Sequence, residues 1–244
     1  MMHGLAFLLL GSLFDQSIAA LLGKQFPDPA VSYIVLDSAT GKLLAQRWDR
    51  ADRPVPVGSL VKPFVAMAAS PDGKFPVFTC NPKQCWLARG HGRMEITAAI
   101  QHSCNSYFLQ LAPGANADFL SRFGLTPPPS NASAETWIGL GREWKLPPIS
   151  VAQAYRMLAS YPQAQPIREG MIQSARSGTG KAFGGGAMVK TGTAACSHLA
   201  GQPGDGYVVA FTAKYTLLVQ MHAAPGATTA ATGGKMLRAI LNGK

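Results

Sequence analysis

Two side chains in the first third of the chain have the types and the spacing that nucleophilic catalysis needs. Ser59 is followed three residues later by Lys62, and residues three apart on a helix lie on one face. A serine hydroxyl attacks well only when a nearby base takes its proton, and a lysine can be that base when burial or a neighbouring cation lowers its pKa. Ser-x-x-Lys alone is common, however, and a capped helix with a solvent-facing lysine would explain it equally well.

Two later segments favour the catalytic interpretation. Ser103-Cys104-Asn105 and Lys190-Thr191-Gly192 follow in that order, the first in a loop between two predicted helices and the second in a predicted edge strand. Ser-x-x-Lys, a Ser-x-Asn-type element and Lys-Thr-Gly are the three-part pattern of penicillin-binding proteins and serine β-lactamases. Three matches in order and in the expected context indicate that Ser59 is the nucleophile of a serine acyltransferase.

The flanking residues resemble the transpeptidase domain of penicillin-binding proteins, and the elongation-type class B members in particular. The resemblance runs from about Tyr33 to Leu241 and does not extend to the N-terminal pedestal and full membrane anchor of those proteins. The segments that carry it, besides the three motifs, are Gly58–Phe64, Cys85-Trp86, Gly90–Gly92, Ala98–Phe108, Gly178–Gly180 and Lys190–Ala194.

The resemblance implies a role for each motif residue. Ser59 would attack the carbonyl of a D-alanyl-D-alanine stem peptide and form an acyl-enzyme, Lys62 would take the proton, and Ser103 would relay it towards the leaving amine. The backbone N–H groups of Ser59 and Thr193 would form the oxyanion hole. Gly192 would allow the substrate to approach the strand closely. The residues expected to bind substrate are Asn105, Lys190, Thr191, Gly192 and Thr193.

The elements that must position these residues predict an α/β (α+β) fold. Extended segments are expected at residues 31–36, 42–48, 187–194, 207–212 and 215–222. Helices are expected at residues 60–69, 96–100, 107–111, 151–161 with Ser150 as N-cap, and 232–241. Strands at both ends with helices between them predict a five-stranded antiparallel sheet flanked by helices, with an inserted all-helical subdomain.

Composition and the N-terminal segment indicate an exported globular protein. The 244 residues are 47% apolar, and 22 Lys and Arg against 12 Asp and Glu give a net charge of +10, which favours anionic surroundings. The basic residues are scattered without interleaved aromatics, which argues against nucleic acid as the partner.

Residues 5–10 suit the apolar core of a signal peptide, and Asp15 interrupts the run before it could span a bilayer. We expect a signal or apolar segment over 1–20, a transpeptidase-like domain over 21–244, an amphipathic helix near residues 15–26, and a periplasmic or cell-envelope location.

The cysteines predict a disulfide rather than a metal site. Cys80 and Cys85 bracket a turn-rich spacer, and a short-loop disulfide suits an oxidising compartment. A zinc site would need two more ligands at matching spacing. Cys104 and Cys196 stand apart and are expected to be small buried side chains. His91 is expected to lie at the cleft edge and to take no direct part in proton transfer. We therefore expect no metal and no cofactor.

The sequence leaves the reaction partly open. A D,D-transpeptidase or D,D-carboxypeptidase would have the peptidoglycan stem peptide as its substrate, β-lactams as inhibitors and a cell-wall synthase as a candidate partner. A class D-like β-lactamase shares two motifs, but usually has an apolar residue where Asn105 stands, and no extra Glu suggests a base for water. A non-catalytic β-lactam sensor would need the same Ser59.

Overall fold

A five-stranded antiparallel sheet organises the molecule, in agreement with the expected fold class. The computed structural model describes residues 17–196 and 203–243. The strand order is β2-β1-β9-β8-β7. The strands are β1 (Val31–Asp37), β2 (Leu43–Arg47), β7 (Met188–Ala194), β8 (Asp205–Phe211) and β9 (Tyr215–Met221). The first and last thirds of the chain therefore pair with each other, because β1 lies between β2 and β9.

Local chemistry explains the first hairpin. The Asp37 carboxylate accepts hydrogen bonds from the backbone N–H and the hydroxyl of Thr40, both at 2.7 Å. Gly41 then takes a φ of +77°, which only glycine adopts at little cost. This turn sets the register between β1 and β2 and confirms the predicted hairpin.

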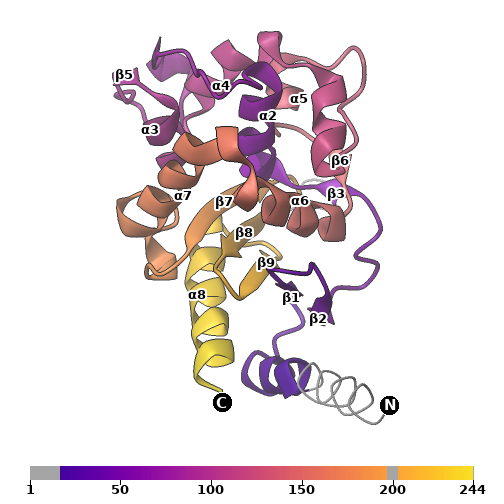
Figure 1. Cartoon of the computed structure of the whole chain (residues 1–244). Helices are drawn as coiled ribbons and strands as arrows, with labels where there is room; N and C mark the ends of the chain where they lie inside the picture. Colours follow the sequence, from indigo (N-terminus) through magenta and orange to yellow (C-terminus); the bar gives the residue numbers. More distant parts are fainter. Residues whose placement is uncertain (1–16, 197–202, 244) are drawn as a thin grey trace.

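The sheet is buried on both faces by side chains that alternate along each strand. On β8, Tyr207 and Val209 join the core under the helical insertion, whereas Val208 and Ala210 join the core under the C-terminal helix. That helix is α8 (Gly226–Asn242), and Figure 1 shows it running alongside the sheet while the insertion stacks at the other side.

The insertion between β2 and β7 holds most of the helices. Its α-helices are α2 (Lys62–Ala69), α3 (Ile96–Gln101), α4 (Asn105–Leu111), α5 (Ala134–Trp137), α6 (Pro148–Ser160) and α7 (Gln165–Ser177). Its 3₁₀ turns are η1 (Gly58–Val61), η2 (Pro82–Gln84), η3 (Ala112–Gly114), η4 (Ala117–Phe123) and η5 (Pro162–Ala164), and η6 (Lys181–Phe183) leads into β7. The insertion also contains two short ladders, β3 (Val55–Pro56) with β6 (Lys145–Leu146) and β4 (Phe78–Thr79) with β5 (Arg93–Met94), so it is mostly rather than wholly helical.

Several helices differ from the sequence prediction. Helix α6 begins at Pro148 rather than after Ser150, because a proline is well suited to the first turn, where its missing N–H costs nothing. Helices α5 and α7 were not predicted. Helix α8 begins six residues before the expected Thr232 and tolerates Gly234, where an added Cβ would lie 2.0 Å from the Phe183 carbonyl oxygen.

The N-terminal part of the described chain packs on the sheet. Residues 17–25 are helical, and Ile18 and Leu22 are buried in the core under α8. This agrees with the amphipathic helix expected near residues 15–26. The helix spans the position at which the expected signal or apolar segment (1–20) meets the expected domain (21–244). Residues 1–16, which hold the apolar run, lie outside the described residues. Among those described, no helix is both long and apolar enough to cross a membrane.

Candidate active site

The nucleophile candidate sits in a 3₁₀ turn that abuts the edge strand β7. Ser59 lies within η1 and is not the N-cap of α2, which begins at Lys62 with Pro63 in its first turn. Gly58 has a φ of +58°, and a Cβ added there would lie 2.3 Å from the Thr193 carbonyl oxygen. The turn can therefore approach β7 this closely only because residue 58 is glycine.

Lys62 is fully buried and is held by the second motif. Its Nζ donates to the Ser103 carbonyl oxygen at 2.8 Å and to Asn105 Oδ1 at 2.5 Å, and lies 3.4 Å from Ser103 Oγ. Burial lowers the pKa of the Lys62 ammonium to about 7, and the thiols of Cys104 and Cys85 act in the opposite direction. A lysine with this pKa is partly neutral at physiological pH and can accept a proton.

A second buried lysine reaches the same serine. Lys190 Nζ donates to Ser103 Oγ at 2.8 Å and to the Thr191 carbonyl oxygen at 2.6 Å. Burial, and to a smaller extent the charge of Lys62, lowers the pKa of Lys190 well below its ordinary value. Ser103 itself has a φ of +50°, a conformation that costs a non-glycine residue about 1–3 kcal/mol. The two lysines and the strained serine thus form one hydrogen-bonded unit.

The predicted residues meet at one cleft of about 410 Å³. Both lysines lie behind its wall, and neither contributes to its lining. The lining residues are Ser59, Trp86, Ser103, Asn105, Leu140, Thr179, Thr191, Gly192, Thr193, Pro225, Gly226 and Ala227. The structure therefore brings the three motifs together as expected.

Several cleft residues were not predicted to have a role. Thr179 accepts a hydrogen bond from the Thr191 hydroxyl at 2.7 Å, and it lies in the Gly178–Gly180 segment that had been noted only as a flank. Trp86 is 55% exposed, and its Nε1 donates to the His102 carbonyl oxygen at 2.9 Å. Trp86 belongs to the Cys85-Trp86 segment that carries the family resemblance, and that resemblance was the signal that could have identified it.

The structure gives a packing reason for Gly192, which also lines the cleft. A Cβ added at Gly192 would meet the Val57 carbonyl oxygen at 3.0 Å and Leu60 at 3.2 Å. Both groups belong to the turn that carries Ser59. The glycine therefore allows β7 to pack against the nucleophile turn, and its role in the close approach of a substrate stays a prediction.

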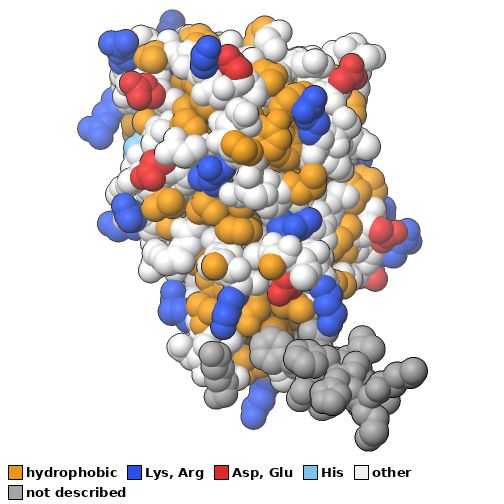
Figure 2. All heavy atoms as spheres, in the orientation of Figure 1, with side chains coloured by type: hydrophobic (Ala, Val, Ile, Leu, Met, Phe, Trp, Pro, Cys, Tyr) orange, Lys and Arg blue, Asp and Glu red, His pale blue; other side chains and the backbone are white. Residues whose placement is uncertain are grey.

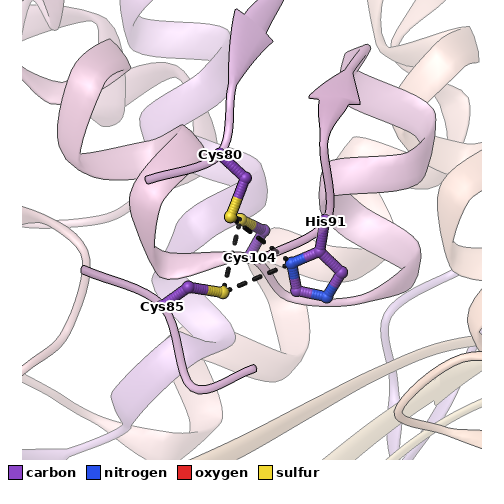
Figure 3. Close-up of side chains that lie close together, drawn as sticks. All are labelled: Cys80, Cys85, His91 and Cys104. Carbon is purple, nitrogen blue, oxygen red and sulfur yellow. Dashed lines mark hydrogen bonds between the residues drawn. The ribbon is translucent and has the colours of Figure 1, made fainter. Parts of the chain in front are cut away.

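The expected Cys80–Cys85 disulfide is absent, because both residues are free cysteines in the structure. Figure 3 shows that the sulfurs of Cys80 and Cys85 lie close to the sulfur of Cys104 and to Nδ1 of His91. All four atoms lie within 4.8 Å of one another. This is a set of soft and borderline ligand atoms that could hold a metal ion, and the expectation of no metal stays a prediction.

The sequence did not indicate this cluster because two of its members come from other elements. Cys104 precedes α4, and His91 precedes β5, whereas Cys80 and Cys85 flank η2. The β4–β5 ladder places Cys80 near the segment of His91, and the Cys80 N–H donates to the Gly92 carbonyl oxygen at 2.9 Å. Only the folded chain brings these positions together.

Comparison with known proteins identifies the family. Residues 31–242 match the penicillin binding protein transpeptidase domain. Peptidoglycan D,D-transpeptidase MrdA of Salmonella typhimurium is 33% identical over 109 residues, which cover 37% of this chain and 18% of that protein. The match thus spans less than a fifth of that relative.

Solved structures share the fold. PBP2 of Pseudomonas aeruginosa, in complex with WCK 5153, aligns with a TM-score of 0.72 at 17% identity, covering 93% of this chain and 74% of that one. A peptidoglycan synthase complex that coordinates polymerization and crosslinking aligns with a TM-score of 0.70 at 16% identity, covering 93% of this chain and 59% of that one. With the three motifs assembled at one cleft and a family match over nearly the whole chain, the protein belongs to the penicillin binding protein transpeptidase domain family.

Proposed function

We propose that the protein is a serine D,D-transpeptidase or D,D-carboxypeptidase that acts on peptidoglycan stem peptides. The observation that carries the proposal is the buried unit behind the cleft, in which Lys62 contacts Ser103 and Asn105 while Ser103 also accepts from Lys190. The family and the name of the MrdA relative support this reaction class.

In the proposed acylation, Ser59 Oγ attacks the carbonyl carbon of the penultimate D-alanine, and its proton passes to the neutral amine of Lys62. The ester bond forms as the peptide bond to the terminal D-alanine breaks. Ser103 Oγ, which Lys190 and Lys62 both approach, delivers a proton to the leaving amine and regains one from the lysines. Attack by an acceptor amine or by water then releases the acyl group and regenerates Ser59.

Substrate binding is assigned to β7 and to the start of α4. The backbone N–H groups of Ser59 and Thr193 would stabilise the oxyanion. Lys190 would supply positive charge, while the hydroxyls of Thr191 and Thr193 would face the substrate carboxylate. Asn105 lines the cleft and would bind the substrate backbone while it fixes Lys62.

We also propose a location and partners. An exported protein in the periplasm or cell envelope would meet its substrate there, and β-lactams would acylate the same serine. The net charge of +10 favours an anionic polymer such as the cell wall. Figure 2 shows Lys and Arg side chains dispersed over one face rather than gathered in a stripe. The shared fold with a peptidoglycan synthase complex makes a cell-wall synthase the proposed protein partner.

The test is D-alanine release from a stem pentapeptide, with and without an acceptor amine. Release that depends on the acceptor indicates a transpeptidase, and release in water alone indicates a carboxypeptidase. Ser59→Ala is expected to abolish both, whereas Ser130→Ala, in an exposed loop, should not change them. Rapid hydrolysis of penicillin without D-alanine release would instead indicate a β-lactamase. Stable acylation without D-alanine release would indicate a sensor.

A further inference from the structure

The third motif presents two hydroxyls at the cleft, and their hydrogen bonds differ. The Thr191 hydroxyl donates its proton to Thr179 Oγ1 at 2.7 Å. The Thr193 hydroxyl oxygen instead accepts from the backbone N–H of Gly226 at 3.2 Å. A hydroxyl has one proton and two lone pairs, so an oxygen that accepts from Gly226 keeps its proton for another acceptor. Of the two motif hydroxyls, Thr193 is therefore the one whose proton is available to a substrate carboxylate in the cleft.

The position of Gly226 depends on the turn between β9 and α8. Gly226 is the first residue of α8, where a backbone N–H has no acceptor within the helix. A Cβ added at Gly226 would lie 2.7 Å from the Gly192 carbonyl oxygen, so the helix start can approach β7 this closely only because the residue is glycine. A Cβ added at Gly206 on β8 would lie 2.5 and 2.8 Å from the carbonyl oxygens of Ala224 and Pro225. The turn is therefore packed tightly against both strands.

A buried carboxylate holds the residue that precedes this turn. Asp205 is the first residue of β8 and has no exposed surface. One of its oxygens accepts a hydrogen bond from Gln220 Nε2 at 2.9 Å, and the other lies 3.0 Å from Nδ1 of His222. Because an ionised carboxylate only accepts hydrogen bonds, the imidazole is the donor. The Asp205–His222 pair therefore ties the end of β9 to the start of β8.

The pair lies immediately before a residue with an unfavourable backbone conformation. The His222 N–H donates to the Ala30 carbonyl oxygen at 3.1 Å, which is the last backbone contact of this end of β9 with the β1 side of the sheet. Ala223 then has a φ of +52°, a left-handed conformation that is costly for a residue with a Cβ. Such a conformation persists only where the surrounding structure holds it. The Asp205–His222 pair holds one end of the turn, and the contact of Gly226 with β7 holds the other.

We propose that Asp205 and His222 are positioning residues for recognition of the substrate carboxylate. The pair holds the turn at residues 223–225, and the turn holds the Gly226 N–H on Thr193 Oγ1, which leaves the Thr193 proton for the substrate. The ligand class is an acyl donor that carries a carboxylate near the bond to be broken. Neither Asp205 nor His222 lines the cleft, so their effect passes through the turn. This inference rests on the proposed function, because it concerns how the same cleft selects its substrate.

The test compares benzylpenicillin, which carries a carboxylate, with its methyl ester, which lacks the charge. The measured quantity is the ratio of the two second-order acylation rate constants, acid over ester. The wild type is expected to favour the acid, and Thr193→Val is expected to lower the ratio at least about tenfold, because one hydrogen bond to a charged group is lost. A variant that only loosens the fold should lower both rate constants together and leave the ratio unchanged.

The deciding variant is His222→Leu, which removes the donor to Asp205. It is expected to lower the ratio about tenfold, nearly to that of Thr193→Val. His222→Asn is expected to restore most of the ratio, because its amide nitrogen is a donor at the same distance from the backbone as imidazole Nδ1. In a Thr193→Val background, His222→Leu should not lower the ratio further, since the two residues act in series. Leu22→Ala, in the core under α8, is the control for lost stability and should keep the wild-type ratio.

The outcomes separate this inference from the proposed function. An unchanged ratio in His222→Leu or in Thr193→Val, or losses that add in the double variant, would overturn the positioning role while the acyltransferase assignment stands. A wild type that neither compound acylates would refute the proposed function and this inference with it. If His222→Leu does not fold, His222→Ala replaces it, because the side chain is 28% exposed and water can take the place of the imidazole. Loss of the fold in both variants would assign the pair to stability alone and would also overturn the proposal.

Discussion

At the residue scale, the chemistry depends on a lysine that the fold makes a base. Lys62 has no exposed surface, and burial is the main cause of its lowered pKa. A neutral amine can take the Ser59 proton, whereas an ammonium cannot. The sequence identified Lys62 by its spacing, but only the structure shows that it lies buried between Ser103 and Asn105.

The pH dependence of acylation follows from this pKa. Because the neutral form of Lys62 increases as pH rises through about 7, the acylation rate constant is expected to rise from pH 5 and level off above pH 8. Penicillin acylation measured from pH 5 to pH 9 checks this. A rate that falls over this range would show that Lys62 is not the base.

Replacement of the lysine gives a direct test of its role. Lys62→Ala is expected to lower the acylation rate constant by more than about tenfold, which corresponds to about 1.4 kcal/mol in the activation barrier. Lys181→Ala provides a control, since Lys181 is an exposed lysine in η6. Acylation of Lys62→Ala within tenfold of wild type would exclude the proposed base.

At the element scale, the site depends on how closely η1 packs against β7. The hairpins and the main helices around the site were predictable because periodicity and turn residues determine them locally. The close approach of Gly58 to Thr193 was not predictable, because it is a contact between segments more than 100 residues apart. The cluster of Cys80, Cys85, His91 and Cys104 escaped prediction because its members come from separate elements that only the folded chain brings together. Helix α7 escaped because its sequence is polar on most of its surface.

The packing of η1 can be tested with two glycines of similar conformation. Gly58 and Gly124 have φ values of +58° and +67°, and no atom lies within 4 Å of a Cβ added at Gly124. Gly124→Ala is expected to lower the free energy of unfolding by about 1 kcal/mol, which is the cost of placing an alanine in a left-handed backbone conformation. Gly58→Ala should cost more and should also abolish acylation, because the turn must move away from Thr193. Urea unfolding and penicillin labelling of both variants measure this difference, and equal effects would contradict it.

At the scale of the whole molecule, the N-terminal helix is part of the domain core. Leu22 is fully buried with α8 and the sheet, whereas Leu43 on β2 is 43% exposed. Leu22→Ala is expected to lower the free energy of unfolding by about 2–5 kcal/mol, and Leu43→Ala by much less. Thermal or urea unfolding checks this. A Leu22→Ala variant as stable as wild type would show that residues 17–25 do not stabilise the domain.

The account as a whole predicts that the assembled motifs make one serine, Ser59, the acyl carrier. Its most direct test is mass spectrometry of the intact protein and of its peptides after incubation with benzylpenicillin. We expect one penicilloyl group per chain, on the peptide that contains Ser59, and none on Ser59→Ala. An adduct on another residue, or none on a folded wild type, would contradict the assignment.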